Sequence, residues 1–548
     1  MVSQKQSSPR APALSLLVSV IIGFCISRAA EAPAWITLGS ALVLGVFSAK
    51  IALTRPHLWL FCFFAAATLS AWTYASWRLP SPPGHKEIDL PVREATLHFE
   101  VTQVMQARTA YGGASGLGRV LQADATSRLA EGDRIYFRLK LPGAEPTELL
   151  RGSTIRAVGL IKAIQPDTQR NTFDTYLIDT GVYHRFTRGR QFEQTKAPSH
   201  FEAFCQRMNK RFESYLRLGS PGSGDLPRIY VAMLLGQKAA LTPEQNERFR
   251  TSGTMHFFAI SGLHIGVIAT VLAQFLLLMR VPRKISPFIG LPLLYLYVEI
   301  TGASPSAVRA FLMALFFWLS FALCRQRSPL AALAASAVFV LIIAPGQLWS
   351  LGFQLSYTVV LSILLFGLPL YEQASQRLAP FTLLPESNWS LWHRFYASSQ
   401  DAVFLLFSIS FSAWLASAPL SAAFFGYFSP LAIILNILLV NLVAVAIITG
   451  VISLALALVG LPFLAEFINH AAWLTIAVMD RLVTASTGMP MHVISTPDFH
   501  KGTAYTVLTI YFILLALIQR NRDRLNQNVL ILAAPPAVII IGLLWGLA

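Results

Sequence analysis

Charged residues are scarce in this sequence of 548 amino acids: they make up 13% of the chain, whereas 54% is hydrophobic. An ordinary soluble domain is about 25% charged, so the composition excludes a soluble globular protein. Cysteine is also rare, and the four residues are Cys25, Cys62, Cys205 and Cys324. Three of them lie in apolar runs and none has the spacing of a metal or redox motif, so no disulfide framework is implied.

Two signatures of catalysis are missing as well. The sequence contains no GxxxxGK[ST] motif, so it predicts no nucleotide hydrolysis of its own. None of the eleven histidines forms HxH or a comparable cluster, and His492 and His500 are too isolated for a metal site. We therefore expect no nuclease or ATPase activity, no metal and no cofactor. No internal repeat of the inverted-repeat transporter type is visible either.

Long apolar runs dominate what is present. Roughly a dozen are long enough to cross a hydrocarbon core of about 30 Å, which predicts a polytopic α-helical membrane protein of about 12–13 spans. Three runs, at residues 14–26, 34–53 and 57–77, form an N-terminal membrane segment of residues 1–79. Lys5, Arg10, Lys50 and Arg55 flank them, which places the N-terminus in the cytoplasm and the region that follows outside.

Residues 80–198 have the composition of a soluble domain inserted between the membrane segments. Short alternating runs predict strands at residues 96–104, 118–123, 133–140, 154–164 and 182–187. Five such strands suit a small β-barrel of the OB type, outside the membrane. Some OB-folds bind single-stranded nucleic acid through basic grooves and stacked aromatics. The candidate DNA-binding residues are Arg134, Arg138, Lys140, Arg156, Arg185 and Arg188.

The aromatic residues among these arginines leave two interpretations open. Tyr136, Phe137, Tyr183 and Phe186 are either stacking platforms for bases or core residues beneath a solvated strand face, and periodicity alone does not distinguish them. In residues 199–225, apolar side chains recur at three- and four-residue steps between basic ones. This pattern predicts an amphipathic basic helix, either along the outer membrane surface or as a packed connector.

Basic clusters in the remaining apolar chain agree on one orientation. Under a count of about thirteen spans, each cluster falls on the cytoplasmic side. The clusters are Arg280, Arg283 and Lys284; Arg325 and Arg327; and Arg520, Arg522 and Arg524. Orientation thus explains much of the net charge of +16, which weakens any inference from charge alone to a nucleic-acid partner.

Polar residues interrupt several of these apolar runs. They occur in HFFAISGLHIG (residues 256–266), in LYVEITGASPSAVRAFLMAL, in GFQLSY and in FSPLAIILNILLVNLV. Polar groups at membrane depth are costly and usually face a bundle interior or a water-filled cavity, although a glutamine, serine or asparagine alone is more often a partner in interhelical hydrogen bonding. Four clusters favour a shared polar interior. The candidate pore-lining residues are His256, Ser261, Gly262, His264, Glu299, Thr301, Ser304, Arg309, Gln354, Ser356, Asn436 and Asn441.

HFFAISGLHIG, TGASPSAVRAFLM and LWSLGFQLSYTVVLSILL, in this order and behind a three-span start with a strand-rich domain, resemble the ComEC family of competence proteins. The resemblance extends to about Gly460, which defines a competence membrane domain at residues 226–460 and additional helices at residues 461–548. It implies an inner-membrane channel that carries single-stranded DNA into the cytoplasm during transformation, with the OB-like domain receiving DNA outside.

The chain also departs from that family. Full-length members carry a C-terminal metallo-β-lactamase-like domain with an HxHxDH motif, which this sequence lacks, and NLVAVA lacks a proline expected near Asn441. The resemblance therefore implies a separate nuclease and a separate motor as partners, besides single-stranded DNA, membrane lipid and a homo-oligomer. Two other functions stay open. One is a small-solute or lipid-linked transporter; the other is an intramembrane serine hydrolase with Ser261 as nucleophile and His256 or His264 as base.

Overall fold

The computed structural model describes residues 12–79, 90–106, 113–140, 149–165, 173–220, 224–322, 328–382, 384–489, 493–520 and 529–546. Several residues that set the predicted orientation lie outside these ranges, as does one cysteine: Lys5, Arg10, Arg325, Arg327, Arg522, Arg524 and Cys324. The chain forms two compact units. One comprises Ser15–Lys210 with Val338–Ser350, and the other comprises Arg211–Ala337 with Leu351–Ala548.

The first unit begins with three helices, α1 (Pro12–Ala29), α2 (Ala34–Ile51) and α3 (Pro56–Arg78). Gly23 allows α1 and α3 to approach closely, because a Cβ at this position would lie 2.4 Å from the Thr68 carbonyl oxygen. The segment Val338–Ser350 packs with these helices: the Tyr74 hydroxyl donates to the Ile342 carbonyl, and the Arg28 guanidinium lies 3.5 Å from the centre of the Trp349 ring.

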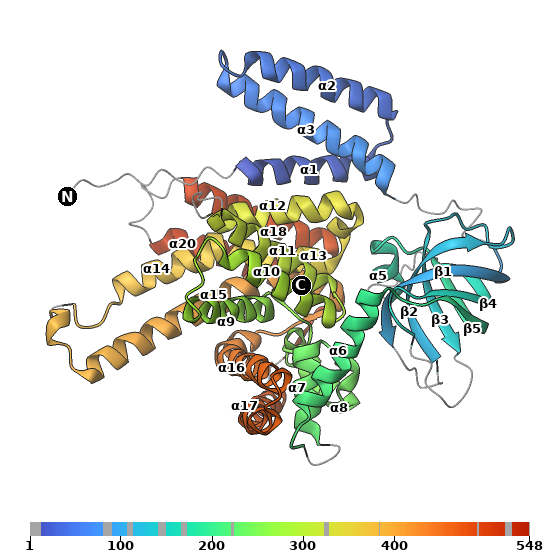
Figure 1. The fold of residues 1–548 in the computed structure, drawn as a ribbon. Coiled ribbons are helices and arrows are strands. Elements are labelled where there is room, and N and C mark those ends of the chain that lie inside the picture. Colours follow the sequence, from blue (N-terminus) through green and yellow to red (C-terminus); the bar gives the residue numbers. More distant parts are fainter. Residues whose placement is uncertain are drawn as a thin grey trace. The chain divides into compact units, whose positions relative to one another are not determined.

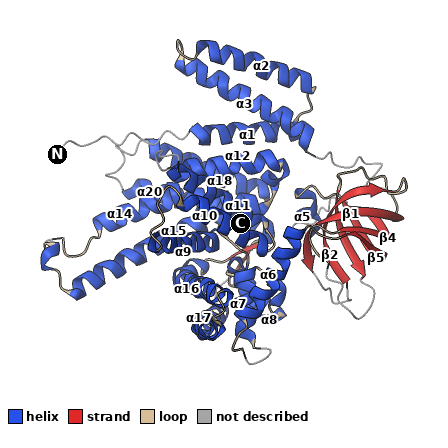
Figure 2. Cartoon of the chain, viewed as in Figure 1, coloured by secondary structure: helices blue, strands red, loops and turns tan. Residues whose placement is uncertain are grey.

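The rest of the first unit is a closed barrel of five strands in the order β1-β2-β3-β5-β4 (Figures 1 and 2). Its core is aromatic and aliphatic, with Leu97, Phe99 and Phe137 fully buried, and its strands alternate buried and exposed residues as a barrel wall requires. The predicted small barrel is therefore confirmed. Its elements are β1 (Arg93–Gln106), β2 (Gly113–Ala123), β3 (Arg134–Lys140), β4 (Thr154–Ala163), α5 (Phe173–Asp179) and β5 (His184–Lys196).

The second unit is almost wholly helical (Figure 2). After α6 (His200–Leu216), whose last turns belong to it, its elements follow in chain order. They are α7 (Asp225–Leu235), η1 (Lys238–Ala240), α8 (Pro243–Thr251), η2 (Met255–Phe258), α9 (Gly262–Leu278), α10 (Ser286–Ile300), α11 (Pro305–Ala322), α12 (Pro329–Ile343), η3 (Pro345–Trp349, of the first unit), α13 (Leu351–Ser362), η4 (Ile363–Gly367), α14 (Leu368–Arg377), η5 (Glu386–Asn388), α15 (Leu391–Phe425), β6 (Tyr427–Phe428), α16 (Ala432–Leu458), α17 (Pro462–Thr487), β7 (Ile494–Ser495), α18 (Lys501–Arg520) and α20 (Val529–Trp545).

Seven helices in the described part of the chain are long and apolar enough to cross a membrane, and six shorter apolar helices accompany them. The seven are Ala34–Ile51, Pro56–Arg78, Leu351–Arg377, Leu391–Phe425, Ala432–Leu458, Pro462–Thr487 and Lys501–Arg520. The chain is thus a polytopic helical membrane protein with a small barrel. The expected 12–13 spans include the shorter helices, since seven alone meet the length criterion.

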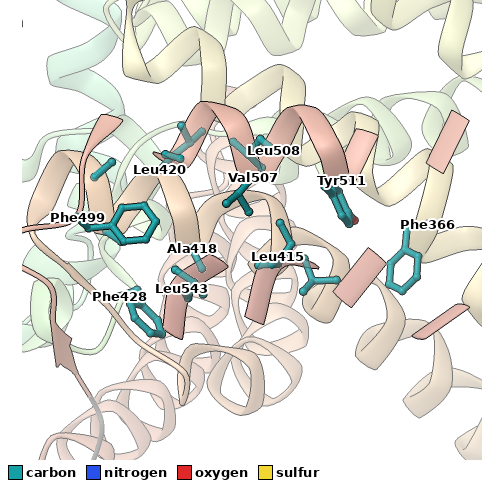
Figure 3. Packing of buried hydrophobic residues seen from close by; sticks show 14 of the residues in the cluster. Phe366, Leu415, Ala418, Leu420, Phe428, Phe499, Val507, Leu508, Tyr511 and Leu543 are labelled. Atoms are coloured by element: carbon teal, nitrogen blue, oxygen red, sulfur yellow. The ribbon is translucent and has the colours of Figure 1, made fainter. Parts of the chain in front are cut away.

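The core of the second unit forms where α13, η4, α15, α18 and α20 meet (Figure 3). Phe366, Leu415 and Leu508 pack there with buried Tyr511. The Tyr511 hydroxyl lies 2.7 Å from the Ser362 hydroxyl, which donates to the Ser412 carbonyl at 2.8 Å. This chain of hydrogen bonds satisfies polar groups that would otherwise be costly inside an apolar bundle.

We expect Ser362→Ala to lower the free energy of unfolding by about 1–3 kcal/mol, because it leaves both the Tyr511 hydroxyl and the Ser412 carbonyl without this partner. Tyr511→Phe should cost less, about 0.5–1.5 kcal/mol, since Ser362 keeps its bond to Ser412. Thermal unfolding of the full chain in detergent measures both. Ile513→Val on the exposed side of the same helix is the control, and equal losses for all three variants would contradict the prediction.

Candidate functional site

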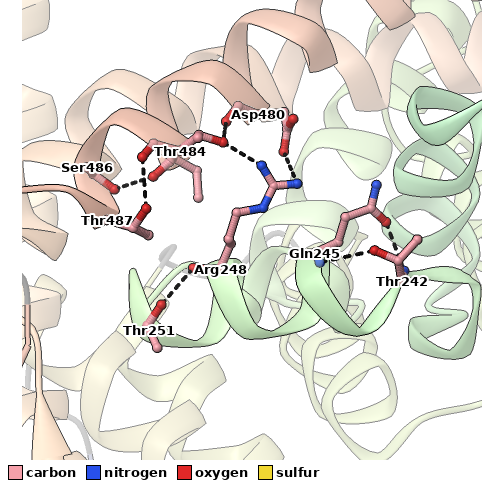
Figure 4. Close-up of polar contacts among 9 residues, drawn as sticks. Thr242, Gln245, Arg248, Thr251, Asp480, Thr484, Ser486 and Thr487 are labelled. Atoms are coloured by element: carbon pink, nitrogen blue, oxygen red, sulfur yellow. Dashed lines mark hydrogen bonds and ion pairs between the residues drawn. The ribbon is translucent and has the colours of Figure 1, made fainter.

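Arg248 is one residue that fixes the segment before α9 to α17 (Figure 4). Arg248 of α8 donates to the Thr484 hydroxyl at 2.6 Å and forms an ion pair with Asp480 at 3.5 Å. Thr242 and Gln245 cap the start of α8 reciprocally, each accepting a backbone N–H of the other at 3.0–3.2 Å. These contacts set where the chain enters η2 and α9.

A helix break at residues 259–261 positions the first candidates. Ser261 is the residue before α9, and its hydroxyl and backbone N–H lie 3.2 and 3.4 Å from His264 Nδ1. His264 is completely buried. His256 points elsewhere: its Nδ1 lies 3.0 Å from the Gly253 carbonyl and its ring packs on Phe257. The structure thus brings Ser261 and His264 together and leaves His256 apart.

Gly262 and Gly266 are exposed on one face of α9. A Cβ at either position would have no atom within 4 Å, so neither glycine is needed for close packing against another helix of this chain. Thr270 continues the same exposed face one turn later. This face of α9 therefore carries small side chains and offers room beside the helix.

The turn between α10 and α11 has two consecutive residues with positive φ, of which only Ala303 is strained because it has a Cβ. Gly302 has φ +90° and Ala303 has φ +47°, a conformation that costs a residue with a Cβ on the order of 1 kcal/mol. Thr301 donates to the Tyr297 carbonyl at 2.9 Å, and Ser304 accepts the Ala307 N–H at 3.4 Å. Thr301 and Ser304 thus hold the two sides of this turn, while Glu299 lies half-buried in the last turn of α10.

Arg309 is the most deeply buried charge among the candidates, with 4% of its surface exposed. Its Nε and Nη2 both donate to the Ser356 hydroxyl at 3.2 Å. Gly352, one turn before Ser356 on α13, makes room for the guanidinium, because a Cβ there would lie 3.1 Å from Nη2. Arg309 and Ser356, 47 residues apart in sequence, are therefore brought into direct contact.

The last three candidates differ in their surroundings. Gln354 accepts a hydrogen bond from the Tyr505 hydroxyl of α18 at 3.2 Å. Asn436 is half-buried and its Oδ1 is enclosed without a hydrogen-bond partner. Asn441 is exposed on α16. The structure does not bring the two asparagines into contact with Arg309 or His264 by any hydrogen bond between these side chains.

The helices that carry the candidates form one connected set. Helix α9 packs against α10, α11 and α16, and α11 packs against α13. Ser261 is the N-cap residue of α9. The other candidates outside η2 lie within the first three turns of α9, α11, α13 or α16, or in the last turn of α10 and the turn after it. Two contacts place the end of α10 and the start of α16 beside the segment that precedes α9. The Tyr297 hydroxyl donates to the Leu234 carbonyl at 2.6 Å, and Gly253 lies beside Ser429 and Ala432.

The barrel candidates are spread over several strands. Arg134, Arg138 and Lys140 are exposed on one face of β3. Arg156 is exposed on β4, and Arg188 is exposed on β5 with φ +53°. Partial desolvation and then the like charge of Arg119 lower the pKa of the Arg134 guanidinium from its ordinary value.

Arg185 and the aromatic residues lie where they stabilise the barrel. Arg185 forms an ion pair with Asp174 of α5 and lies 5.8 Å from the Tyr136 ring and 5.7 Å from the Phe173 ring. Phe137 and Phe186 are fully buried, and Tyr136 packs edge-on against Phe173. Of the two interpretations of these aromatics, core packing describes these three, so they supply no exposed platform for bases.

A second buried polar network escaped the sequence reasoning. Asn469 of α17 is fully buried; it accepts from the Ser453 hydroxyl at 2.7 Å and donates to the Tyr215 carbonyl, near the end of α6, at 2.8 Å. Gly219, with φ +77°, passes so close that a Cβ would meet Glu466. A lone asparagine in an apolar run was the available signal, the same signal that selected Asn436. In the described ranges, no group of three or more His, Cys, Asp or Glu side chains is placed to hold a metal ion.

Comparisons with known proteins identify relatives. The model of the Competence protein family matches residues 233–521, a segment that contains all twelve pore-lining candidates. ComE operon protein 3 of Bacillus subtilis (strain 168) is 27% identical over 309 residues, which cover 55% of this chain and 36% of that protein. An uncharacterized protein of Aquifex aeolicus (strain VF5) is 33% identical over 143 residues, 26% of this chain and 33% of that protein. The chain thus spans about a third of the length of these curated relatives. No solved structure matches significantly.

We expect Ser356→Ala to destabilise the protein by about 1.5–3 kcal/mol, because a buried guanidinium loses a hydrogen-bond acceptor. In an Arg309→Met background the same substitution should cost much less, since no buried charge then depends on the hydroxyl. The free energies of unfolding of the wild type, the two single variants and the double variant, measured in detergent, complete this double-mutant cycle. Simple additivity of the two substitutions would show that the contact contributes nothing to stability.

Proposed function

We propose that this chain, which belongs to the ComEC family of competence proteins, acts in DNA uptake and passes a single strand of DNA across the membrane. The observation that carries the proposal is the distribution of the polar candidates over one connected set of helices, at the same kind of position on each: the starts of α9, α11, α13 and α16 and the end of α10. A polyanion needs such a continuous polar path, because phosphate charges are prohibitively costly in lipid.

Alternation of membrane spans supports a common location for these ends. If consecutive apolar helices from α9 to α16 cross in alternate directions, with η4 and α14 continuing α13, the end of α10 and the starts of α9, α11, α13 and α16 fall on one side of the membrane. The contacts of Tyr297 with Leu234 and of Gly253 with Ala432 support the same grouping. We name this group of ends, with the twelve candidates, the mouth of the path.

The mouth suits an anion for two physical reasons. Four helices begin there, and the first turn of each helix presents unsatisfied N–H groups and the positive end of its dipole. Arg309 adds a full positive charge close behind the strained turn between α10 and α11. Ser261, Ser304 and Gln354 supply neutral hydrogen-bonding groups, which allow a strand to pass without binding tightly.

Charge asymmetry supports an orientation in the cell inner membrane with the mouth outside. Arg280, Arg283 and Lys284 follow α9 at the end opposite the mouth, and basic loops favour the cytoplasm. The same rule gives a cytoplasmic N-terminus and places residues 80–198, after three spans, outside. The barrel domain and the mouth of the membrane domain at residues 226–460 would then face the same compartment, where incoming DNA arrives.

The proposed path needs partners. We propose that a separate motor supplies energy, a separate nuclease supplies the single strand, and a second copy of the chain can join it in the membrane. A transporter of small or lipid-linked solutes is the alternative for the same polar interior. The hydrolase alternative draws on the 3.2 Å contact between Ser261 and His264. His264 Nδ1, however, lies within hydrogen-bond distance of both the Ser261 backbone N–H and the Ser261 hydroxyl, which is the geometry of a helix cap rather than of a nucleophile and its base and disfavours that reaction.

Labelling of single cysteines tests the orientation. In a background without the native cysteines, Ser304→Cys should react in whole cells with a membrane-impermeant thiol reagent, because it lies at the mouth. Arg283→Cys, at the other end of α10, should react only after the membrane is opened. Labelling of both positions from outside, or of neither, would contradict a span between them.

Transformation of the source organism tests the path. Deletion should block arrival of DNA in the cytoplasm while DNA still reaches the cell surface, and an Arg309→Ala/His264→Ala variant at matched membrane levels should reduce transformants by at least about tenfold relative to wild type, because it removes a charge and a polar group from the mouth. Arg283→Ala is the matched control and should restore uptake.

The outcomes separate the alternatives. Unchanged transformation after deletion would reject the DNA-uptake function. Ser261→Ala should retain much of the transformation, since a channel wall tolerates loss of one hydroxyl; complete loss with this substitution alone, at normal protein level, would favour the hydrolase.

A further inference from the structure

Two arginines on the barrel face each other without a counter-charge. Arg119 of β2 and Arg134 of β3 are directly opposite in the antiparallel register, and both side chains are exposed. Like charges in such a pair destabilise a sheet. Neither arginine side chain forms an ion pair or a hydrogen bond with the residues that the structure describes, so no side-chain partner there compensates for this cost.

The arginine pair adjoins a formed cleft. A cavity of about 370 Å³ is lined by Arg119, Val120, Leu121, Glu131 and Gly132. Its wall is the turn that leads into β3, and backbone hydrogen bonds fix that turn to β2. Gly132, at φ +95°, donates to the Val120 carbonyl at 2.8 Å, and Val120 donates to the Asp133 carbonyl at 2.8 Å. Asp133 accepts the Ala130 N–H at 2.8 Å, which closes the turn.

The geometry points to a binding site for one phosphodiester group of a nucleic-acid strand, held between Arg119 and Arg134 at this cleft. The inference rests on the proposed function, because it identifies where the barrel first contacts DNA. Two guanidinium groups give planar, charge-assisted donors that match phosphate oxygens. A bound phosphate also offsets the repulsion between the two arginines. Relief of this repulsion adds to the free energy of phosphate binding.

Charge around the cleft favours a diester. Glu131 lines the same cavity, is exposed, and forms no ion pair within the described ranges. Arg119 and Glu131 line the cleft, and Arg134 lies opposite Arg119 in the register, so the carboxylate offsets part of the charge of the arginines. This suits the single charge of a backbone phosphodiester better than the two charges of a free phosphomonoester. The exposed Arg138 and Lys140 extend the same face of β3 beyond Arg134, so neighbouring phosphates would find cations along that strand.

The site differs from the aromatic platform that OB-folds use for bases. Phe137 and Phe186 are core residues, and no aromatic side chain lines the cleft. If the protein contacts only the phosphodiester backbone of the strand, binding should show no sequence preference and should depend strongly on salt concentration. It also predicts that a strand without bases binds nearly as well as one with bases.

Oligonucleotide binding by the full chain tests the site. The protein is placed in nanodiscs of phosphatidylcholine, and fluorescence anisotropy follows a labelled 12-residue thymidine oligonucleotide and an abasic oligomer of the same length over a range of salt concentrations. Arg119→Gln and Arg134→Gln should each weaken binding of both probes on the order of tenfold and reduce the slope of log K against log salt by about 0.7.

Two matched variants make the test specific. Glu131→Gln should strengthen binding about two- to threefold, because it removes a negative charge from the cleft. Arg190→Gln, an exposed arginine of β5 whose partner is Glu94, should leave the slope unchanged although it removes the same charge from the same barrel. Equal loss for Arg119→Gln and Arg190→Gln would mean that only total charge matters and would overturn the site.

Further outcomes distinguish the ligand and the function. If Arg119→Gln weakens binding to phosphatidylglycerol vesicles but not to either oligomer, a lipid headgroup is the ligand and the inference is wrong. If cleft variants bind normally while the Arg309→Ala/His264→Ala variant blocks transformation, the site fails and the proposed function stands. If cleft variants lose oligomer binding while deletion leaves transformation unchanged, the site stands and the proposed function fails.

Discussion

The buried guanidinium of Arg309 imposes the constraint on which the membrane unit depends. A charge that is 4% exposed among apolar helices is stable only with acceptors and space around it. Ser356 provides an acceptor and Gly352 provides the space, one helical turn apart on α13. This requirement fixes the start of α13 against α11, and α11 in turn packs on α9 and α10. A residue that appears costly in isolation thereby determines how four helices meet.

The sequence predicted those features that follow from composition and period. Alternating runs gave five strands and a closed barrel, although β1 extends to Arg93–Gln106 and β5 to His184–Lys196, because register with neighbouring strands, rather than hydropathy, decides where a strand ends. Polar residues in apolar runs identified both Arg309 and Ser356. The contact between them could not be predicted, since it depends on the packing of helices 47 residues apart in sequence.

The surroundings of individual polar side chains depend on the direction in which each side chain points in the folded protein. The order of residues in the sequence does not give that direction. Arg185 and Arg138 are both basic residues on strands, yet Arg185 lies between Tyr136, Phe173 and Asp174 because α5 covers that part of the barrel. Asn469 and Asn436 gave the same signal, an asparagine in an apolar run. Asn469 proved to be hydrogen-bonded to Ser453 and Tyr215, whereas Asn436 Oδ1 is enclosed without a partner. Only three-dimensional neighbours distinguish these two asparagines.

The arginines of the two units illustrate one physical distinction. Arg309 is buried, so the folded chain itself must supply its partners, and substitution of those partners affects stability before it affects any ligand. Arg119 and Arg134 lie exposed on the barrel surface, so the fold tolerates their repulsion although Arg134 is partly desolvated. An uncompensated pair of this kind gains from an anion that arrives from solution. Burial thus distinguishes Arg309, whose charge is held between the membrane helices and would act on the proposed path from within the fold, from exposed arginines that a phosphate can contact directly. Net charge alone does not make this distinction.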